Sequence, residues 1–107
     1  MKKHAPIVVN LQSPREKYWG IMLSIDGAGV NVKGIDLNSF EDWIREVAKG
    51  EGTMGLSTVF FPMHRVERIG LDENIGEIKS QAAVFESRVG TDVWTHLGLS
   101  KPEEESE

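Results

Sequence analysis

The stretch "EKYWGIMLSIDGAGVNVKGI", residues 16–35, has the pattern of two strands joined by a tight turn. Residues 16–26 are rich in aromatic and β-branched side chains, and an extended chain places four apolar ones on a single face: Trp19, Ile21, Leu23 and Ile25. Residues 26–29 predict a tight turn and residues 30–35 predict a second strand. Gly20 lies inside the first strand, where glycine indicates a bend or a close backbone approach. The sequence therefore predicts an antiparallel hairpin whose first strand bends, or closely approaches another backbone, at Gly20.

Three further segments predict the rest of a β-sheet. Residues 6–14 alternate their side chains between two prolines, as a strand does, and extend the hairpin to a three-stranded antiparallel meander. Residues 56–61 and 66–73 predict two more strands, with only Pro62–Arg65 between them. The last strand would turn two apolar side chains inward, Ile69 and Leu71. Five short antiparallel strands with tight turns favour a small barrel, because closing a sheet removes its exposed edges.

The period of the apolar residues changes to that of a helix in two places. Residues 38–49 carry four apolar side chains at helical spacing, Phe40, Trp43, Ile44 and Val47. Residues 77–98 predict two C-terminal helices, the first of which ends at Gly90 and carries a stripe of Ile78, Ala82, Phe85 and Val89. We therefore expect a mainly β fold with helices (α+β), in which one helix is inserted between the third and fourth strands.

Length and charge limit the functions that this chain can have. Its 107 residues suffice for one compact domain, which we assign to residues 1–100. Residues 101–107 account for −3 of the formal net charge of −5 and predict an acidic, disordered tail, which leaves −2 on the body. DNA binding requires clustered lysine and arginine, so we expect no DNA partner.

Composition also bears on the compartment. The sequence contains no cysteine, which excludes disulfides and thiolate metal sites. No stretch is long and apolar enough for a membrane span or for the apolar region of a signal peptide. We therefore expect a cytoplasmic protein without a membrane partner.

Two parts of the chain together resemble one family of small barrels. The first part has a glycine, two apolar residues and an aspartate at the family's spacing, Gly20, Met22, Ile25 and Asp26, and Val30–Asn31 follows one position late. The second part, "VFFPMHRVERI" (residues 59–69), is a strand, a very short turn and a strand. Over residues 6–35 and 57–72 the chain resembles the Sm and Sm-like proteins, including the Hfq-type RNA chaperones.

This resemblance implies a five-stranded, bent, antiparallel barrel of SH3-like or Sm-like type. It also implies assembly into rings by pairing of edge strands, and contacts from two turns to the bases of single-stranded RNA. The matching contact residues on this sequence are Asn31 and His64, and Arg65 is a neighbour of the family position. Met63 replaces the lysine of the Hfq-type turn.

The residues themselves leave two interpretations open at each candidate contact. His64 and Arg65 provide either an anion or base contact at an exposed turn, or polar side chains that are only exposed or pair with Glu67 or Asp72. Tyr18 is a candidate stacking platform for bases, and it points outward if Trp19 faces the core.

No catalytic, metal or cofactor motif is present in the sequence. The three histidines are isolated, and residues 72–77 lack the order of a calcium loop. The sequence contains no nucleophile-elbow motif for which His64 could act as a general base, so we predict no catalytic residue. The glycines are scattered and precede no phosphate-binding helix, so we interpret those at 27, 29, 34, 50, 52 and 55 as turn glycines.

These observations predict a non-enzymatic interaction or assembly module, which binds itself as a homo-oligomer or binds another protein. The alternative is an Sm-like protein that contacts single-stranded RNA through the turns at 26–31 and 62–65. An unidentified enzyme is the third hypothesis, because short sequences can hide their sites.

Overall fold

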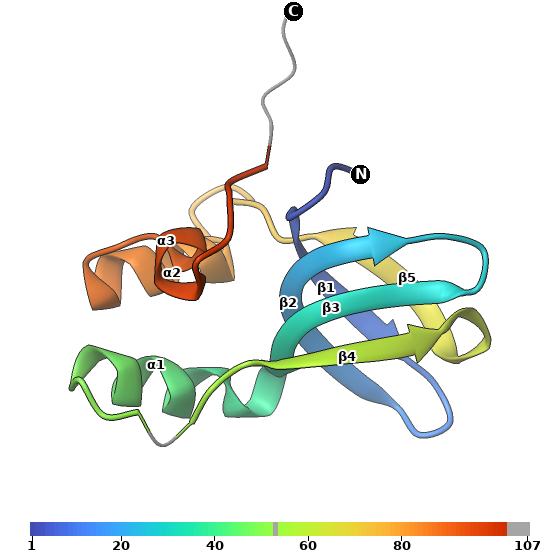
Figure 1. Cartoon of the computed structure of the whole chain (residues 1–107), viewed down its shortest axis with the longest axis horizontal. Helices are drawn as coiled ribbons and strands as arrows, with labels where there is room; N and C mark the ends of the chain where they lie inside the picture. Colours follow the sequence, from blue (N-terminus) through green and yellow to red (C-terminus); the bar gives the residue numbers. More distant parts are fainter. Residues whose placement is uncertain (53, 103–107) are drawn as a thin grey trace, which may run out of the picture.

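The computed structural model describes residues 1–52 and 54–102. Five strands form a single antiparallel sheet in the order β4-β3-β2-β1-β5 (Figure 1). Their bounds are β1 Pro6–Leu11, β2 Glu16–Ile25, β3 Gly29–Asp36, β4 Ser57–Pro62 and β5 Val66–Leu71. The predicted α+β class and the predicted antiparallel strands are therefore confirmed. The sheet is strongly curled, but among the described residues no ladder joins β4 to β5, so it is not a closed barrel.

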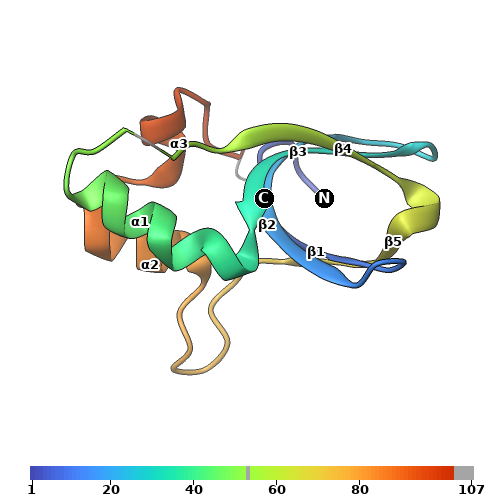
Figure 2. The same ribbon diagram turned by 90° about the horizontal axis from the view of Figure 1, so that it is seen from below.

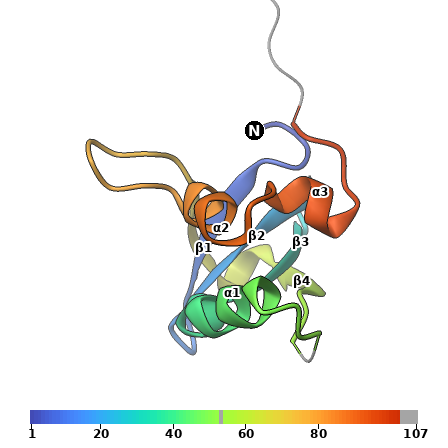
Figure 3. The ribbon, with the colours of Figure 1, turned by 90° about the vertical axis from the view of Figure 1, so that its left-hand side faces the viewer.

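Helices cover one end of the curled sheet, as Figures 1 and 3 show. The inserted helix is confirmed as the short 3-10 helix η1 (Leu37–Ser39) followed by α1 (Phe40–Ala48). Two C-terminal helices follow β5, α2 (Gln81–Val89) and α3 (Val93–Leu97). The predicted acidic tail lies almost entirely outside the described residues.

The segment before α2 differs from the prediction. Ile75 and Ile78 pair across a two-residue turn, with backbone N···O distances of 2.9 and 3.0 Å, so the helix does not include them. Gly76 has a φ of +60°, which suits a turn and not a helix. Ser80 then caps α2, since its Oγ accepts from the backbone N–H of Ala83 at 3.0 Å. Ile78, which we predicted to be in the helix stripe, is 73% exposed.

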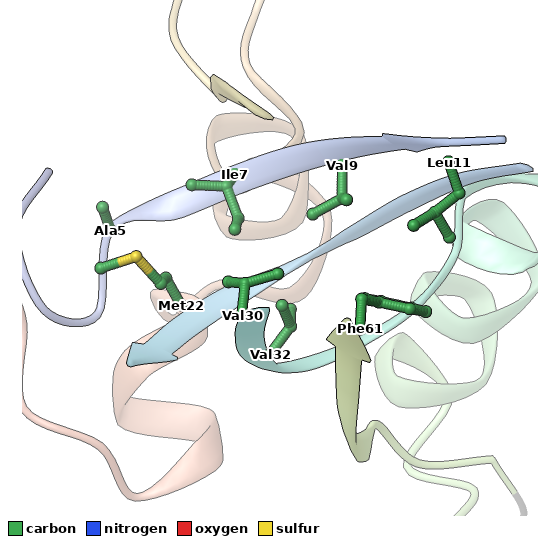
Figure 4. Packing of buried hydrophobic residues seen from close by; sticks show 8 residues of the cluster. All are labelled: Ala5, Ile7, Val9, Leu11, Met22, Val30, Val32 and Phe61. Atoms are coloured by element: carbon green, nitrogen blue, oxygen red, sulfur yellow. The ribbon is translucent and has the colours of Figure 1, made fainter. Parts of the chain in front are cut away.

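The sheet carries an apolar cluster on each of its faces. The inner cluster fills the concave side (Figure 4) and consists of Ala5, Ile7, Val9, Leu11, Met22, Val30, Val32 and Phe61. The helix-facing cluster lies between the sheet and the helices and consists of Trp19, Ile21, Phe40, Trp43, Ile44, Phe85 and Val93. Strand β2 contributes to both, because its alternate side chains enter opposite clusters.

Two side chains that we expected to face inward, Ile25 and Leu71, are exposed. Trp19 and Ile21 are buried together as predicted, but the register of β2 and β3 shifts between Met22 and Ser24, and Ile25 is 41% exposed. On β5, Ile69 packs against the inner cluster, whereas Leu71 at the strand end is 50% exposed.

Gly20 and Gly34 face each other across β2 and β3 at the bend of the sheet. A Cβ on Gly20 would collide with the Val32 side chain and lie 2.6 Å from the Lys33 carbonyl oxygen. A Cβ on Gly34 would collide with the Trp19 carbonyl oxygen. The bend predicted at Gly20 is therefore present, but the interpretation of Gly34 as a turn glycine is wrong, because it lies inside β3.

Asp72 joins the sheet to the helices. Its carboxylate accepts hydrogen bonds from the indole Nε1–H of Trp19 at 3.0 Å and from the backbone N–H groups of Gln81 and Ala82 at 2.8 and 2.9 Å. The first turn of a helix leaves such N–H groups without intrahelical partners. One carboxylate therefore accepts hydrogen bonds from the free N–H groups at the start of α2 and from the indole of Trp19, which packs in the helix-facing cluster.

We expect Gly20→Ala and Gly34→Ala each to lower the free energy of unfolding by about 2–3 kcal/mol, because the added methyl group meets backbone atoms that cannot move away. Urea denaturation followed by tryptophan fluorescence measures this. Gly70→Ala is the matched control, since Gly70 also lies in a strand but a Cβ there meets nothing within 4 Å. Equal stabilities for Gly20→Ala and Gly70→Ala would contradict the close approach.

Candidate functional site

Two turns meet at the end of the sheet that lies away from the helices (Figure 1). One is the β2–β3 turn, where Asp26 Oδ1 accepts from the backbone N–H of Ala28 at 2.8 Å. The other is the 3-10 turn η2 (Met63–Arg65), which joins β4 to β5. The backbone N–H of Met63 donates to the Ala28 carbonyl at 2.9 Å, so the two turns are adjacent. The two segments that the sequence predicted as RNA contacts are thus brought together.

Arg65 holds the β1–β2 hairpin in place. Its guanidinium forms an ion pair with Glu16 at 3.0 Å and donates to the carbonyl oxygens of Pro14 at 2.9 Å and Gln12 at 3.2 Å. The predicted partners Glu67 and Asp72 are not the ones it uses, because the hairpin folds over η2 and brings Glu16 closer. An anion could recruit this guanidinium only by displacing contacts that stabilise the hairpin.

His64 and Asn31 are available at the surface. His64 is exposed, and its backbone carbonyl accepts from Gln12 Nε2 at 3.2 Å. Asn31 donates from Nδ2 to Ser24 Oγ at 2.9 Å and stands opposite Phe60, whose side chain is 48% exposed. These side chains could contact a ligand without unfolding, but no ligand is implied by their geometry, and binding of single-stranded RNA stays a prediction.

Tyr18 does not point outward. Its ring packs edge-on against Phe61 at 5.0 Å between centroids, and its hydroxyl donates to the Gly34 carbonyl at 3.1 Å. Burial and the negative charge of Asp36 raise the pKa of the Tyr18 phenol above its ordinary value, although a hydrogen bond with Ser57 opposes this. The expectation failed because both faces of β2 are covered, so a buried Trp19 does not leave its neighbour in solvent.

The two outer strands, β4 and β5, each present backbone groups to solvent. In antiparallel ladders, residues that bond to the partner strand alternate with residues whose N–H and C=O point away from it. The bond from Met63 N–H to the Ala28 carbonyl sets this alternation for β4, and the bond from Asp72 N–H to the Pro6 carbonyl sets it for β5. The residues whose backbone N–H and C=O groups point away from the sheet are therefore Thr58 and Phe60 on β4, and Ile69 and Leu71 on β5.

Figure 2 shows β4 and β5 on opposite sides of the curled sheet. Within the described part of the chain, none of their four outward N–H groups has a backbone partner. The sequence predicted a closed barrel and so did not locate these edges, although the resemblance implied that edge strands pair. The signal that was present is the pair of large apolar residues beside them, Phe60 and Leu71.

Residues 74–79, which we name the apolar hairpin, project from the body next to the end of β5 (Figure 2). Ile75 and Ile78 at its tip are 68% and 73% exposed. The hairpin is braced at its base, where Asn74 Oδ1 accepts from the backbone N–H of Ser80 at 2.8 Å. Large apolar side chains held in solvent by an ordered turn are typical of a contact surface.

The described residues contain neither a metal-binding cluster nor a membrane-spanning helix. No three histidine or acidic side chains among residues 1–52 and 54–102 come close enough together to hold a metal ion. Over the same ranges, no helix has the length and apolar character needed to cross a membrane.

Comparisons of the chain with protein-family models, with curated proteins and with solved structures found no match. The functional interpretation therefore depends on the geometry described above.

We expect the single tyrosine of this chain to titrate above its ordinary pKa of 10.0 in the folded protein and at that value in 8 M urea. Because folding raises this pKa, its contribution to stability is present below pH 10 and is lost as the pH rises through the folded-state pKa. Absorbance at 295 nm measures the titration, and the near-ultraviolet circular dichroism of the tryptophans checks folding at each pH. Equal pKa values in buffer and urea would mean that Tyr18 is exposed.

Proposed function

We propose that this protein is a non-enzymatic assembly module of Sm-like type that associates with copies of itself through its two open sheet edges. The observation that carries the proposal is the pair of unsatisfied edges, β4 and β5, on opposite sides of one bent sheet. Unpaired strand edges act as templates for another strand, and natural proteins usually blunt them with charge or cover them.

The residues on the edges favour pairing over avoidance. Each edge carries an exposed large apolar side chain, Phe60 on β4 and Leu71 on β5. Addition of β5 from one copy to β4 of the next would satisfy the outward backbone groups of Thr58, Phe60, Ile69 and Leu71 together. Such a head-to-tail contact uses different surfaces on the two copies, so repetition closes into a ring or continues as a fibre.

The apolar hairpin adds a second surface next to β5. It begins three residues after that strand ends, so pairing along β5 would bring Ile75 and Ile78 close to the neighbouring copy. Burial of two isoleucine side chains would contribute about 3–6 kcal/mol of transfer free energy to an interface before the costs of association. The resemblance to Sm-like proteins supports the same mode of assembly, since those barrels form rings through edge strands.

We expect the mass in solution to exceed the 11.9 kDa of one chain at high concentration and to fall towards it in Phe60→Lys and Leu71→Lys. A lysine beside a strand edge repels a second strand and keeps the edge solvated. Light scattering after gel filtration between 5 and 500 µM measures this.

Ile25→Lys is the matched control, because Ile25 is a comparably exposed apolar residue on the central strand β2, away from both edges. It should assemble like the unmodified chain. A mass of one chain at every concentration for the unmodified protein would overturn the proposal.

A further inference from the structure

A shallow groove of about 360 Å³ lies on β1 and β2, between their hairpin and η1. It is on the outer face of these strands, which is the face opposite the inner cluster. Its lining residues are Asn10, Leu11, Arg15, Glu16, Lys17, Leu37, Asn38 and Glu67. The volume lies at the lower end of the range of small-molecule sites. The groove is therefore large enough for a small organic ligand.

A row of side chains crosses three strands beside this groove. Asn10 on β1 stands opposite Lys17 on β2 and opposite Arg68 on β5. Asn10 lies between Val9 and Leu11, whose side chains are buried in the inner cluster. Because side chains alternate along a strand, the row that contains Asn10 is on the outer face. Directly opposite residues have Cβ atoms about 5 Å apart, so two cations flank one amide.

The charges in and beside the groove do not cancel. Among the described residues, Arg15, Lys17 and Arg68 have no carboxylate oxygen within 4.0 Å. The lining contains two carboxylates, Glu16 and Glu67. Glu16 is paired with Arg65 at 3.0 Å, so Glu67 is the carboxylate that still opposes the cations of the groove. In the same part of the chain the side-chain amides of Asn10 and Asn38 make no hydrogen bond within the protein. Cations and amide donors therefore face the groove with spare capacity for an acceptor.

We propose that this groove binds a small organic anion that carries a phosphate group. The phosphate would lie against Lys17, Arg15 and the Asn10 amide, because charged donors form the stronger hydrogen bonds to phosphate. The rest of the molecule would extend towards Leu37 and Asn38 on η1, where the groove offers an apolar side chain and an amide. This site is on the outer face of β1 and β2, and it does not depend on the proposed pairing of β4 and β5.

The test is a titration of the ¹⁵N-labelled chain with inorganic phosphate and with ribose 5-phosphate, at pH 7.5 and constant ionic strength. We expect saturable shifts of the amide signals of Asn10, Lys17, Leu37 and Asn38, and tighter binding of ribose 5-phosphate than of phosphate. Arg15→Gln with Lys17→Gln should weaken binding at least about tenfold, because two charged donors are lost. Glu67→Gln should tighten it about threefold, because a repelling charge is removed.

The control variant is Lys3→Gln with Lys49→Gln, which removes two positive charges from residues outside the groove lining and should leave binding unchanged. All these positions are exposed, so we expect the variants to keep the fold, and the same spectra check this. Shifts that do not saturate, or equal weakening in both double variants, would overturn the site. Equal affinity for phosphate and ribose 5-phosphate would contradict an organic ligand. Binding of hexauridylate that is lost in Arg15→Gln with Lys17→Gln, without any binding of ribose 5-phosphate, would contradict a small ligand.

Discussion

The close approach of β2 and β3 at Gly20 and Gly34 determines how the sheet curls and what it can enclose. A side chain at either position would push the two strands apart and open the bend. The bend lets one short sheet enclose the inner cluster on its concave side while the opposite side of β2 packs Trp19 and Ile21 under the helices. A chain of this length has few residues to bury, so use of both faces of one strand increases the area removed from water.

The helices then determine which parts of the sheet a partner can reach. Asp72 fixes the start of α2 and the indole of Trp19 with one carboxylate, and α1 and α3 complete the cover over the same end. The opposite end, both outer strands and the groove beside η1 stay in contact with solvent. In the proposed function, copies of the chain satisfy the outer strands, while the groove is free to bind a small ligand in each copy.

The sequence predicted features that depend on local pattern and missed those that depend on contacts between distant segments. The bend at Gly20, the inserted helix and the strand–turn–strand at β4 and β5 follow from periodicity and turn residues, and all are present. The partner of Gly34 and the pairing of Arg65 with Glu16 depend on how distant segments are aligned in space, which one sequence does not contain. The positions of the open edges depend on the order of the strands in the sheet, which it does not contain either. The error at Ile78 has a different cause, because a helical spacing of apolar residues there competes with a turn signal at Gly76.

Pairing of the edge strands between copies of the chain can be followed residue by residue through amide hydrogen exchange, measured at increasing protein concentration. We expect the amides of Thr58, Phe60, Ile69 and Leu71 to exchange fast in dilute protein and to become protected as the concentration rises. The amides of Val59 and Gly70, which the alternation turns towards the sheet, should be protected throughout. Equally fast exchange of the four outward amides at low and high concentration would mean that the edge strands do not pair.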